Sequence, residues 1–455
     1  MSGAGHDSSV NRRGFLRLAV GGGTLLAAGM GCKSGSNTEK SKAATASTAK
    51  PTLRIAKRTN YISGYDEWWD REVAGRWGER NGISVVVEHF DVNQLQAQAQ
   101  SEVASQRGHD LFQLVGSGAP FEDAAIDHRE IVEQVETTIG KMAPFVERSI
   151  ANPKTGKCFA FSDSWNPSPV HYRTDLWDGI GQEPESWDDL LRAGKLLKAR
   201  GHPIGIGMSP DLESNATLLG LLFSYGASIQ DEEGRVALNS RATVEAVKVG
   251  AALFRSAMTD EVLGWDITSN NRYFVSGRGS LIVNSIAALR ALEAQDAELA
   301  AKTGLRPVPA GPLGRRAPYA VNVYMIWKFA ENQEAAKRFL VDTIRDSRAS
   351  FLESQYLQIP SFPAAAGALA DLIASDSRAQ PTGKYALLAE AEEWTTNLGY
   401  PGHTNIAIQE VLDASVVSEM FAAAARGDMS AEEAVRTAEA KTRSIYDKWR
   451  EQGKI

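Results

Sequence analysis

The chain has 455 residues and a formal charge of -7, with 43% hydrophobic and 23% charged residues. This length is enough for two hydrophobic cores, and the composition is that of an ordinary globular protein, which excludes collagen, a coiled coil and wholesale disorder. Lysine and arginine are scattered among the acidic residues rather than gathered in a basic stripe, which excludes nucleic acid as a partner.

The first 32 residues have the pattern of an export signal. The pair Arg12-Arg13 precedes an apolar run, residues 18–30, that is too short to span a membrane comfortably. Residues 11–17, Asn-Arg-Arg-Gly-Phe-Leu-Arg, resemble the twin-arginine export consensus, with Asn and Arg as departures at its two ends. We therefore expect twin-arginine export. An accidental arginine pair in a signal for the general secretion pathway is the alternative.

The leader ends at a cysteine. Residues 29–32, Gly-Met-Gly-Cys, resemble a bacterial lipobox, although the usual leucine three residues before the cysteine is absent. The stretch that follows is rich in Ser, Thr, Ala, Gly and Lys, which is typical of a flexible tether. We expect a leader over 1–32, a lipidated Cys32, a tether over 33–51, and a protein anchored to the cell membrane and facing the periplasm or the cell exterior. Cleavage after residues 27–29, which would release the protein, is the alternative.

After the tether, strand and helix patterns alternate. Strands are predicted at 52–56, 83–87 and 110–115, and helices at 66–80 and 93–107. Short glycine-containing links join them, which indicates an α/β fold with a largely parallel sheet. Ligands bind outside the carboxyl ends of such strands, so we expect the loops at 60–64 and 116–118 to face a site.

The rest of the chain is mostly helical in pattern. Helices are predicted at 187–199 and 241–258, apolar strands at 281–284 and 324–327, and further helices to residue 454. Ser186 precedes the first of these helices as an N-cap residue.

Six segments of the chain carry recognisable patterns, at residues 81–85, 170–177, 184–190, 274–281, 307–312 and 332–340. Together and in this order they resemble landmarks of the family of bacterial extracellular solute-binding proteins that includes the maltose-binding protein. The segment 184–190, Pro-Glu-Ser-Trp-Asp-Asp-Leu, matches the family's helix start well, whereas Arg173 replaces the asparagine that is usual in the hinge-proximal segment.

The resemblance implies an α/β fold of two lobes, the type II periplasmic-binding-protein fold. Lobe 1 is expected to comprise 52–163 and about 313–350, and lobe 2 to comprise 164–312 and about 351–455, with hinge strands near 161–164 and 307–312. The resemblance also implies that a small solute, expected to be a sugar, binds between the lobes. Closure of the lobes over the solute is then expected to create the surface that an ABC permease recognises. A monomer without catalytic activity or cofactor is expected.

A sugar site needs flat aromatic rings that stack on the sugar and polar groups that bind its hydroxyls. Placed on the family's strand ends, the candidate ligand-binding residues are Asn60, Tyr61, Ser63, Gly116, Ser117, Trp165, Asn166, Trp265, Asn270, Asn284 and Ser285. Trp165 and Trp265 are the expected stacking platforms. Many sugar-binding relatives carry a tryptophan soon after the strand at 281–284, but this chain continues Asn-Ser-Ile-Ala, so that platform is missing.

The sequence gives little support for a metal site, a disulfide framework or a catalytic pair. Only two cysteines occur, Cys32 and Cys158, which excludes a cysteine-cluster metal site and a disulfide framework within the chain. Cys158 is interpreted as a small buried hydrophobic residue. The seven histidines have no metal-ligand spacing, and the acidic pair Glu392-Glu393 falls on a predicted exposed helix, so neither a metal site nor a catalytic pair is expected.

Two alternatives stay open. A non-sugar solute such as a polyamine or a polyol phosphate is possible within the binding class, but a polyamine site needs several convergent carboxylates, and few lie at the expected loops. An enzyme exported by the twin-arginine route belongs to another class, against which stands the absence of cofactor motifs.

Overall fold

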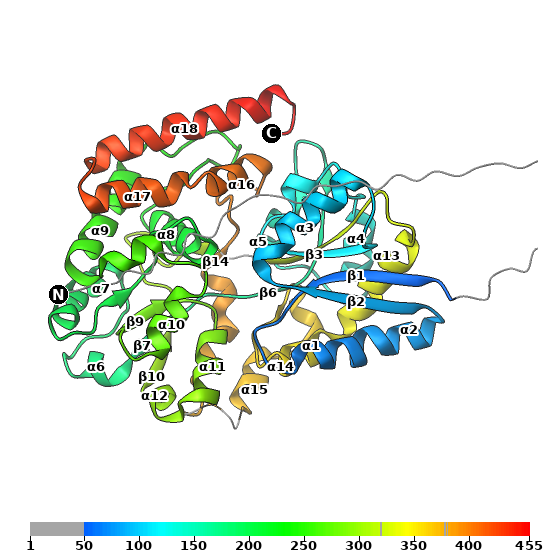
Figure 1. Cartoon of the computed structure of the whole chain (residues 1–455), viewed down its shortest axis with the longest axis horizontal. Helices are drawn as coiled ribbons and strands as arrows, with labels where there is room; N and C mark the ends of the chain where they lie inside the picture. The colour runs from blue at the N-terminus through cyan, green and yellow to red at the C-terminus, as the bar shows by residue number, and fades with distance from the viewer. Residues whose placement is uncertain (1–49, 319–320, 377–378, 380) are drawn as a thin grey trace, which may run out of the picture. The chain divides into compact units, whose positions relative to one another are not determined.

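The computed structural model describes residues 50–318, 321–376, 379 and 381–455 (Figure 1). Arg12, Arg13 and Cys32 lie outside the described residues, so the predictions of an export signal and of lipidation rest on the sequence. The described chain from Lys50 to Ile455 is one compact unit. None of its described helices is long and apolar enough to cross a membrane.

A six-stranded sheet forms the centre of the first lobe, with the strand order β13-β6-β12-β3-β1-β2. Its strands are β1 (Thr52–Arg58), β2 (Ser84–Phe90), β3 (Leu111–Val115), β6 (Phe161–Trp165), β12 (Val321–Ile326) and β13 (Ile359–Pro360). β1 pairs in parallel with β2 and β3, whereas β12 and β13 run antiparallel to their neighbours. The expectation of a largely parallel sheet is therefore correct only for β1, β2 and β3, because β12 returns from the other lobe in the opposite direction.

Helices cover both faces of this sheet, and Figure 1 shows α2 and α3 on opposite sides of β1 and β2. The helices of this lobe are α1 (Tyr65–Trp68), the π-helical η1 (Trp69–Gly75), α2 (Arg76–Asn81), α3 (Val92–Ser105), η2 (Ala119–Phe121), α4 (Arg129–Thr138), α5 (Pro144–Ile150), α13 (Gln333–Thr343), η4 (Ile344–Asp346) and α14 (Ser347–Glu353). Trp69 and Trp77 pack edge-on against Phe339 of α13, with ring centroids 5.9 and 5.1 Å apart, which ties η1 and α2 to α13. The predicted β-α-β-α-β opening is confirmed.

The second lobe is built on a smaller sheet with the order β10-β7-β9-β8. Its strands are β7 (Val170–Arg173), β8 (Ile204–Gly205), β9 (Leu281–Val283) and β10 (Thr303–Arg306). Only β8 and β9 pair in parallel.

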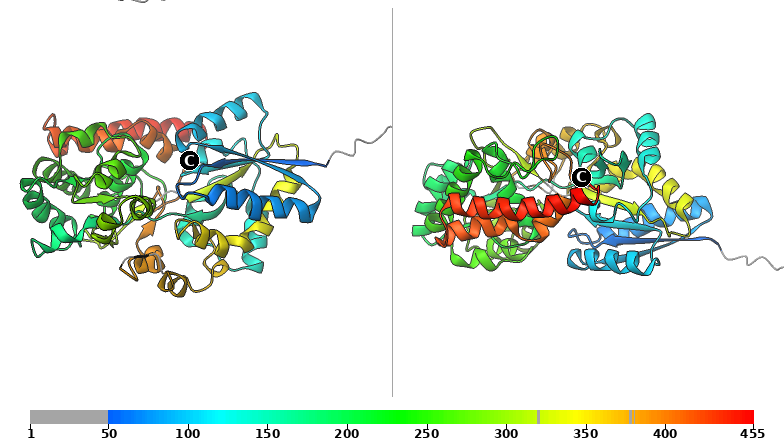
Figure 2. Two further views of the ribbon diagram at one scale, coloured as in Figure 1. Left: turned by 60° about the horizontal axis from the view of Figure 1, so that its bottom comes forward. Right: turned by 90° about the horizontal axis from the view of Figure 1, so that it is seen from above.

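Helices dominate this lobe. They are α6 (Thr174–Asp178), α7 (Trp187–Ala199), α8 (Leu212–Ser224), α9 (Arg241–Ala257), η3 (Asp260–Gly264), α10 (Ser269–Val275), α11 (Ala287–Gln295), α12 (Ala297–Ala301), α16 (Ile406–Asp413), α17 (Val416–Arg426) and α18 (Ala431–Glu451). Ser186 accepts a hydrogen bond from Asp189 N at 3.2 Å, which confirms the predicted N-cap of α7. Figure 2 shows α17 and α18 side by side along the outside of the lobe.

The chain passes between the two larger sheets more than once. It leaves the first after β6 and enters the second at β7, returns after β10 to β12, and crosses again between β13 and the C-terminal helices. The last two passages meet where β11 (Ala317–Pro318) pairs with β14 (Thr395–Thr396). This third passage also holds η5 (Pro363–Ala365), α15 (Leu369–Ala374) and η6 (Ala386–Glu393), and the hairpin β4 (Ala151–Asn152) and β5 (Lys157–Cys158) completes the described strands. The exact division into lobes stays a prediction.

Candidate functional site

A cavity of about 570 Å³ lies between the loops of the two larger sheets, and we call it the cleft cavity. The first lobe contributes Val92, Asn93, Gln96, Val115 and Gly116. The second contributes Pro210, Asp211, Leu212, Asn215, Trp265, Asp266 and Ile267, and the C-terminal part adds Leu398, Gln409, Leu412 and Asp413. This volume is within the range of sites that hold small molecules.

The wall from the first lobe is set by a helix start and a turn. Asp91 caps α3 by accepting a hydrogen bond from Asn93 N at 2.9 Å, and this places Asn93 and Gln96 in the first turns beside the cavity. Gly116 follows β3 with φ of +96°, a backbone conformation that favours glycine. This wall therefore offers amide side chains and a stretch of backbone without a side chain.

The opposite wall begins at the N-terminus of α8. Asp211 Oδ1 accepts hydrogen bonds from Glu213 N at 3.0 Å and Ser214 N at 3.1 Å, so its carboxylate is held where the helix dipole favours negative charge. One turn further, Asn215 is only 5% exposed, and its Oδ1 accepts no hydrogen bond from any described residue. The cavity thus contains a fixed carboxylate and an amide oxygen with unused hydrogen-bonding capacity.

Trp265 provides the aromatic surface of the cavity. Its ring is partly exposed and packs on Tyr273, with the centroids 5.2 Å apart and the planes at 51°. A Cβ on Gly205 would lie 3.0 Å from Trp265 Cη2, so glycine at this strand position lets the indole rest directly on β8. The ring is therefore held in place before any ligand arrives, as stacking on a sugar requires.

Two further carboxylates come from separate segments. Asp266 is bound by Arg272, with Oδ2 3.0 Å from Nη2, and the hydrogen bond from this arginine is the main cause that lowers the pKa of the carboxyl. Asp413, at the end of α16, accepts a hydrogen bond from Gln409 Nε2 at 2.8 Å, and partial burial raises its pKa. Three aspartates therefore line the cleft cavity, and one of them, Asp266, is paired with a cation.

Gly116 and Trp265 are the two predicted site residues that line this cavity. Ser117, which follows Gly116, is 6% exposed and accepts a hydrogen bond from Ala119 N at 3.1 Å. The loop after β1 lies elsewhere on the first lobe's edge: Ser63 is exposed, and Asn60 Oδ1 accepts a hydrogen bond from Ile62 N at 2.9 Å.

Tyr61 is half exposed, and the guanidinium of Arg58 lies 4.9 Å from its ring centre. Its surroundings raise the pKa of the Tyr61 hydroxyl, mainly by desolvation, and the carboxylate of Glu213 on α8 acts in the same direction. The Tyr61 ring therefore lies within the electrostatic reach of the second lobe.

Three predicted residues at the end of β9 bind one another rather than lining the cavity. Asn284 Nδ2 donates to Asn270 Oδ1 at 2.9 Å, Asn270 Nδ2 donates to Val283 O at 3.2 Å, and Ser285 N donates to Asn284 Oδ1 at 2.6 Å. All three are at most 6% exposed.

Trp165 and Asn166 end β6, where the chain leaves the first lobe. The Trp165 ring is 2% exposed and packs edge-on against Phe145, with centroids 4.8 Å apart, and its Nε1 finds no acceptor within the described residues. Asn166 is also buried, and its amide nitrogen, turned to face the carbonyls of Trp165 and Leu357, donates at 3.0 and 2.8 Å.

Sequence reasoning missed several lining residues of the cavity, namely Asn93, Gln96, Asp211, Asn215, Gln409 and Asp413. The pattern Ser-Pro-Asp before an apolar run, at residues 209–211, is an N-cap signal that could have located Asp211. No local signal marks Gln409 or Asp413, because only the tertiary fold brings α16 to the cavity.

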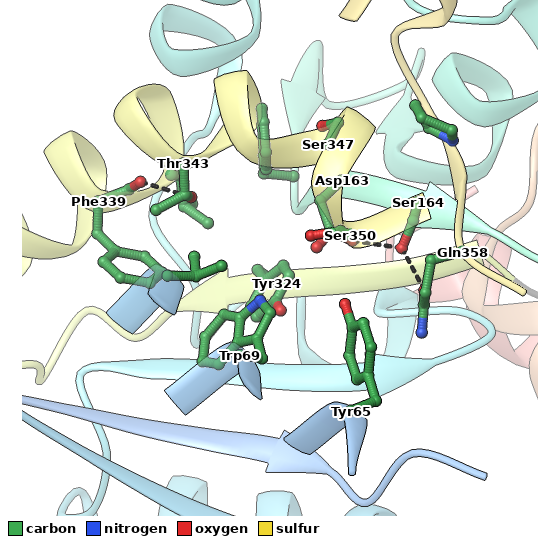
Figure 3. A pocket seen from close by; sticks show the side chains of 14 residues that line it. Tyr65, Trp69, Asp163, Ser164, Tyr324, Phe339, Thr343, Ser347, Ser350 and Gln358 are labelled. Atoms are coloured by element: carbon green, nitrogen blue, oxygen red, sulfur yellow. Dashed lines mark hydrogen bonds between the residues drawn. The ribbon is translucent and has the colours of Figure 1, made fainter. Parts of the chain in front are cut away.

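A second, much smaller cavity of about 20 Å³ is enclosed in the first lobe (Figure 3). Figure 3 shows the Tyr65 hydroxyl pointing toward Asp163 and Ser350. Burial raises the pKa of Asp163 and lowers the pKa of the neighbouring Lys57 to about 8. This cavity has room for about one water molecule, so it is too small for a sugar.

The part of the chain that the structure describes contains no group of three or more His, Cys, Asp or Glu side chains that could hold a metal ion.

Two curated relatives match part of the chain. A binding protein of Brucella abortus is 26% identical over 211 residues, which is 44% of this chain and 50% of that protein. An ABC transporter-binding protein of Deinococcus radiodurans is 25% identical over 189 residues, 38% of this chain and 45% of that protein. The chain thus spans about half the length of the curated relatives it matches.

Solved structures share the fold over most of the chain. An oligosaccharide periplasmic-binding protein from Synechococcus superposes with a TM-score of 0.74 at 19% identity, covering 87% of this chain and 100% of that one. The maltose-bound MalE3 protein of T. maritima gives 0.70 at 19% identity, with 87% and 99% covered. A sugar transporter protein from Arthrobacter chlorophenolicus with bound laminaribiose gives 0.71 at 15% identity, with 87% and 99% covered. These matches show the two-lobe periplasmic-binding-protein fold.

The family comparison covers more than half of the chain. Residues 62–341 match the family described as bacterial extracellular solute-binding protein. This stretch includes both walls of the cleft cavity up to Trp265 and the strands that cross between the lobes. The chain belongs to the bacterial extracellular solute-binding protein family.

Proposed function

We propose that this protein is the solute-binding component of an ABC importer and that it captures a mono- or oligosaccharide between its lobes for delivery to a membrane permease. The family match and the name of the Deinococcus relative support the transport role. The sugars in the titles of the matched structures, maltose and laminaribiose, support the solute class. The protein is proposed to bind as a monomer and to catalyse no reaction.

The cleft cavity is the observation that carries this proposal. A sugar presents apolar ring faces edged by hydroxyl groups, and the cavity offers the fixed indole of Trp265 together with the amides of Asn93, Gln96 and Asn215. Closure of the lobes over the solute removes water and strengthens these hydrogen bonds. Tyr61 and Trp165 are proposed to join the site in the closed state, and the other predicted residues stay predictions. Trp165 Nε1 is a donor that still lacks an acceptor.

A thermal-shift screen over sugars, polyamines and polyol phosphates, followed by calorimetric titration of the best hits, tests this function. We expect a sugar to saturate the protein at one to one, to raise its unfolding temperature, and to be recovered unchanged. Conversion of the sugar into product would show an enzyme instead. Saturation by a polyamine or a polyol phosphate, with no response to any sugar, would contradict the solute class.

The export and anchoring proposals concern residues outside the described structure. The twin-arginine pattern at Arg12-Arg13 and the lipobox-like ending at Cys32 support an exported lipoprotein. Cys32→Ala should release the protein from the membrane fraction, and unchanged membrane association would contradict lipidation. Changing both arginines to lysine should leave precursor in the cytoplasm, whereas normal processing of that variant would point to the general secretion route.

A further inference from the structure

The charge of the cleft cavity restricts the solute further than its shape does. Of the described residues that line the cavity, three are aspartates, and none is lysine, arginine or histidine. The aspartates come from three separate segments: Asp211 before α8, Asp266 before α10 and Asp413 at the end of α16. Three carboxylates therefore line the cavity in which the solute is proposed to bind.

Only one of these carboxylates is neutralised by a cation. Asp266 forms an ion pair with Arg272, as described above. The hydrogen bonds that Asp211 accepts within the described chain come from backbone N–H groups and from the hydroxyls of Ser209 and Ser214, none of which carries a charge. Asp413 accepts its hydrogen bond from the neutral amide of Gln409. Among the described residues, neither Asp211 nor Asp413 therefore has a cationic partner at the cavity.

A second observation points to a missing hydrogen-bond donor at the same place. Asn215 is 5% exposed, lines the cavity, and has an Oδ1 that accepts no hydrogen bond within the described residues. Leaving a buried acceptor unsatisfied costs about 1–3 kcal/mol, so a solute that supplies a donor gains this contribution. An ammonium or hydroxyl group can supply that donor, whereas a carboxylate or phosphate ester dianion cannot.

Arg58, the cation at the end of β1, does not change this balance. Arg58 does not line the cavity, is 3% exposed, and lies beneath the ring of Tyr61. The carboxylate of Glu213 is close enough to Tyr61 to act on its hydroxyl, so this end of the cleft carries both signs of charge. The cavity itself remains acidic.

We propose that the solute of this cleft carries a protonated amine and is an amino sugar or an oligosaccharide that contains one. The inference rests on the proposed function, because it assigns the chemical class of the sugar. The ammonium group lies near Asp211 and Asp413, and the hydroxyl groups bind the amides of the cavity. A ring face stacks on Trp265, which a linear polyamine cannot do. Anionic sugars are repelled by the same carboxylates.

Matched sugars test the proposal. Affinity is measured by calorimetry for amino sugars of gluco, galacto and manno configuration, for their neutral parents, and for the corresponding uronates. Cellobiose and the glucosamine disaccharide with the same linkage extend the series. We expect at least one amino sugar to bind ten or more times more tightly than its neutral parent, and every uronate to bind most weakly of its set.

The outcomes distinguish a failure of the amino-sugar proposal from a failure of the proposed function. If a neutral sugar binds as tightly as its aminated partner, the amino-sugar proposal is wrong while sugar capture stands. A preference for a uronate has the same meaning and points to Arg58. Tighter binding of spermidine than of any sugar, or no binding of any sugar, contradicts the proposed function itself.

Variants that remove the charge of one carboxylate test which aspartates cause the preference for amino sugars. Asp211→Asn keeps the helix cap, since asparagine is also a good N-cap residue, and Asp413→Asn keeps a side chain of the same size. Each should weaken amino-sugar binding about five- to tenfold and change neutral-sugar binding less than twofold. Asp188→Asn, on the exposed side of α7 and outside the lining of the cavity, is the control and should change both less than twofold. Equal losses for aminated and neutral sugars, with unfolding temperatures unchanged, would overturn the assignment of these carboxylates.

Discussion

The two lobes differ in what they bury. Beneath the six-stranded sheet, the first lobe encloses ionisable groups, among them Lys57 and Tyr324, beside a small cavity. In the second lobe, every residue of α8 from Glu213 to Ser224 is buried, and the leucines of this stretch pack in the hydrophobic core of that lobe. The first lobe should therefore respond to changes of charge state and the second to changes of side-chain volume.

Removing volume from α8 should give the largest effect. Leu219 is fully buried in the apolar cluster of the second lobe. Leu219→Ala should lower the free energy of unfolding by about 3 kcal/mol, because it removes buried methyl groups and leaves a cavity. Chemical denaturation measures the change. Leu196→Ala on α7, where the side chain is 51% exposed, is the control and should cost less than about 0.5 kcal/mol. Equal losses at both positions would contradict the described packing of α8.

The charge state of Lys57 should produce an effect of similar size in the first lobe. Burial lowers its pKa from 10.5 to about 8, so between these values the unfolded chain binds a proton that the folded protein does not. Stability should therefore rise with pH across this window, by about 3 kcal/mol in total. The free energy of unfolding is measured at pH 7, 8, 9 and 10 for wild type and for Lys57→Met. The difference between the two proteins gives the part of the pH dependence that Lys57 causes.

The matched control is Lys195→Met, because Lys195 is exposed on α7. This variant should keep the rise with pH, whereas Lys57→Met should lose it. A slope that survives in Lys57→Met would show that another group causes it.

His171 on β7 is an exception to this difference between the lobes, because it is a fully buried ionisable group in the second lobe. Burial lowers its pKa from 6.5 to about 3, so the stability that depends on the neutral ring is present above pH 6.5 and is lost as the pH falls toward 3. By pH 5 the loss should reach about 2 kcal/mol. His171→Asn retains a donor for Pro169 O and should be less sensitive to acid.

His128 in the first lobe, whose pKa burial lowers to about 4, titrates over the same range. The test is therefore the difference between wild type and His171→Asn at pH 7 and pH 5. Identical differences at the two pH values would mean that His171 does not control the acid response.

Trp265 should give the smallest of these effects in free energy, but a specific one. Loss of the stacking contact should reduce the free energy of binding by about 1.4 kcal/mol, so Trp265→Ala should weaken binding of the best sugar roughly tenfold. Fluorescence or calorimetric titration measures the affinity. Trp68→Ala, on α1 and away from the cleft cavity, should bind like wild type. An unchanged affinity in a folded Trp265→Ala protein would remove this ring from the proposed site.

The sequence predicted the first lobe's opening well because its elements are local. The apolar alternation of residues 52–56 and 83–87 identifies β1 and β2 without reference to distant residues. It could not show that β12 lies between β3 and β6, because that pairing depends on side chains more than a hundred residues away on both sides. The antiparallel half of the sheet was therefore missed.

The candidate site was predictable to a similar degree. Gly116 and Trp265 were identified because loops at strand ends are the usual place for ligand contacts. The same rule selected Asn270 and Asn284, whose side chains bind each other and do not line the cavity, so their role in ligand binding stays a prediction. The carboxylates of Asp211 and Asp413 escaped because acidic residues at helix ends are common on protein surfaces.

The position of β12 in the first sheet also affects how the protein is made. β3 pairs with β12 on one side, and about 200 residues separate Val115 from Val321, so this edge of β3 stays open until the residues between them have been synthesised. An open strand edge can pair with other chains, and contacts between such distant residues slow folding. A nascent chain of this protein is therefore exposed to aggregation for a long time, and bound chaperones would protect it best at β3.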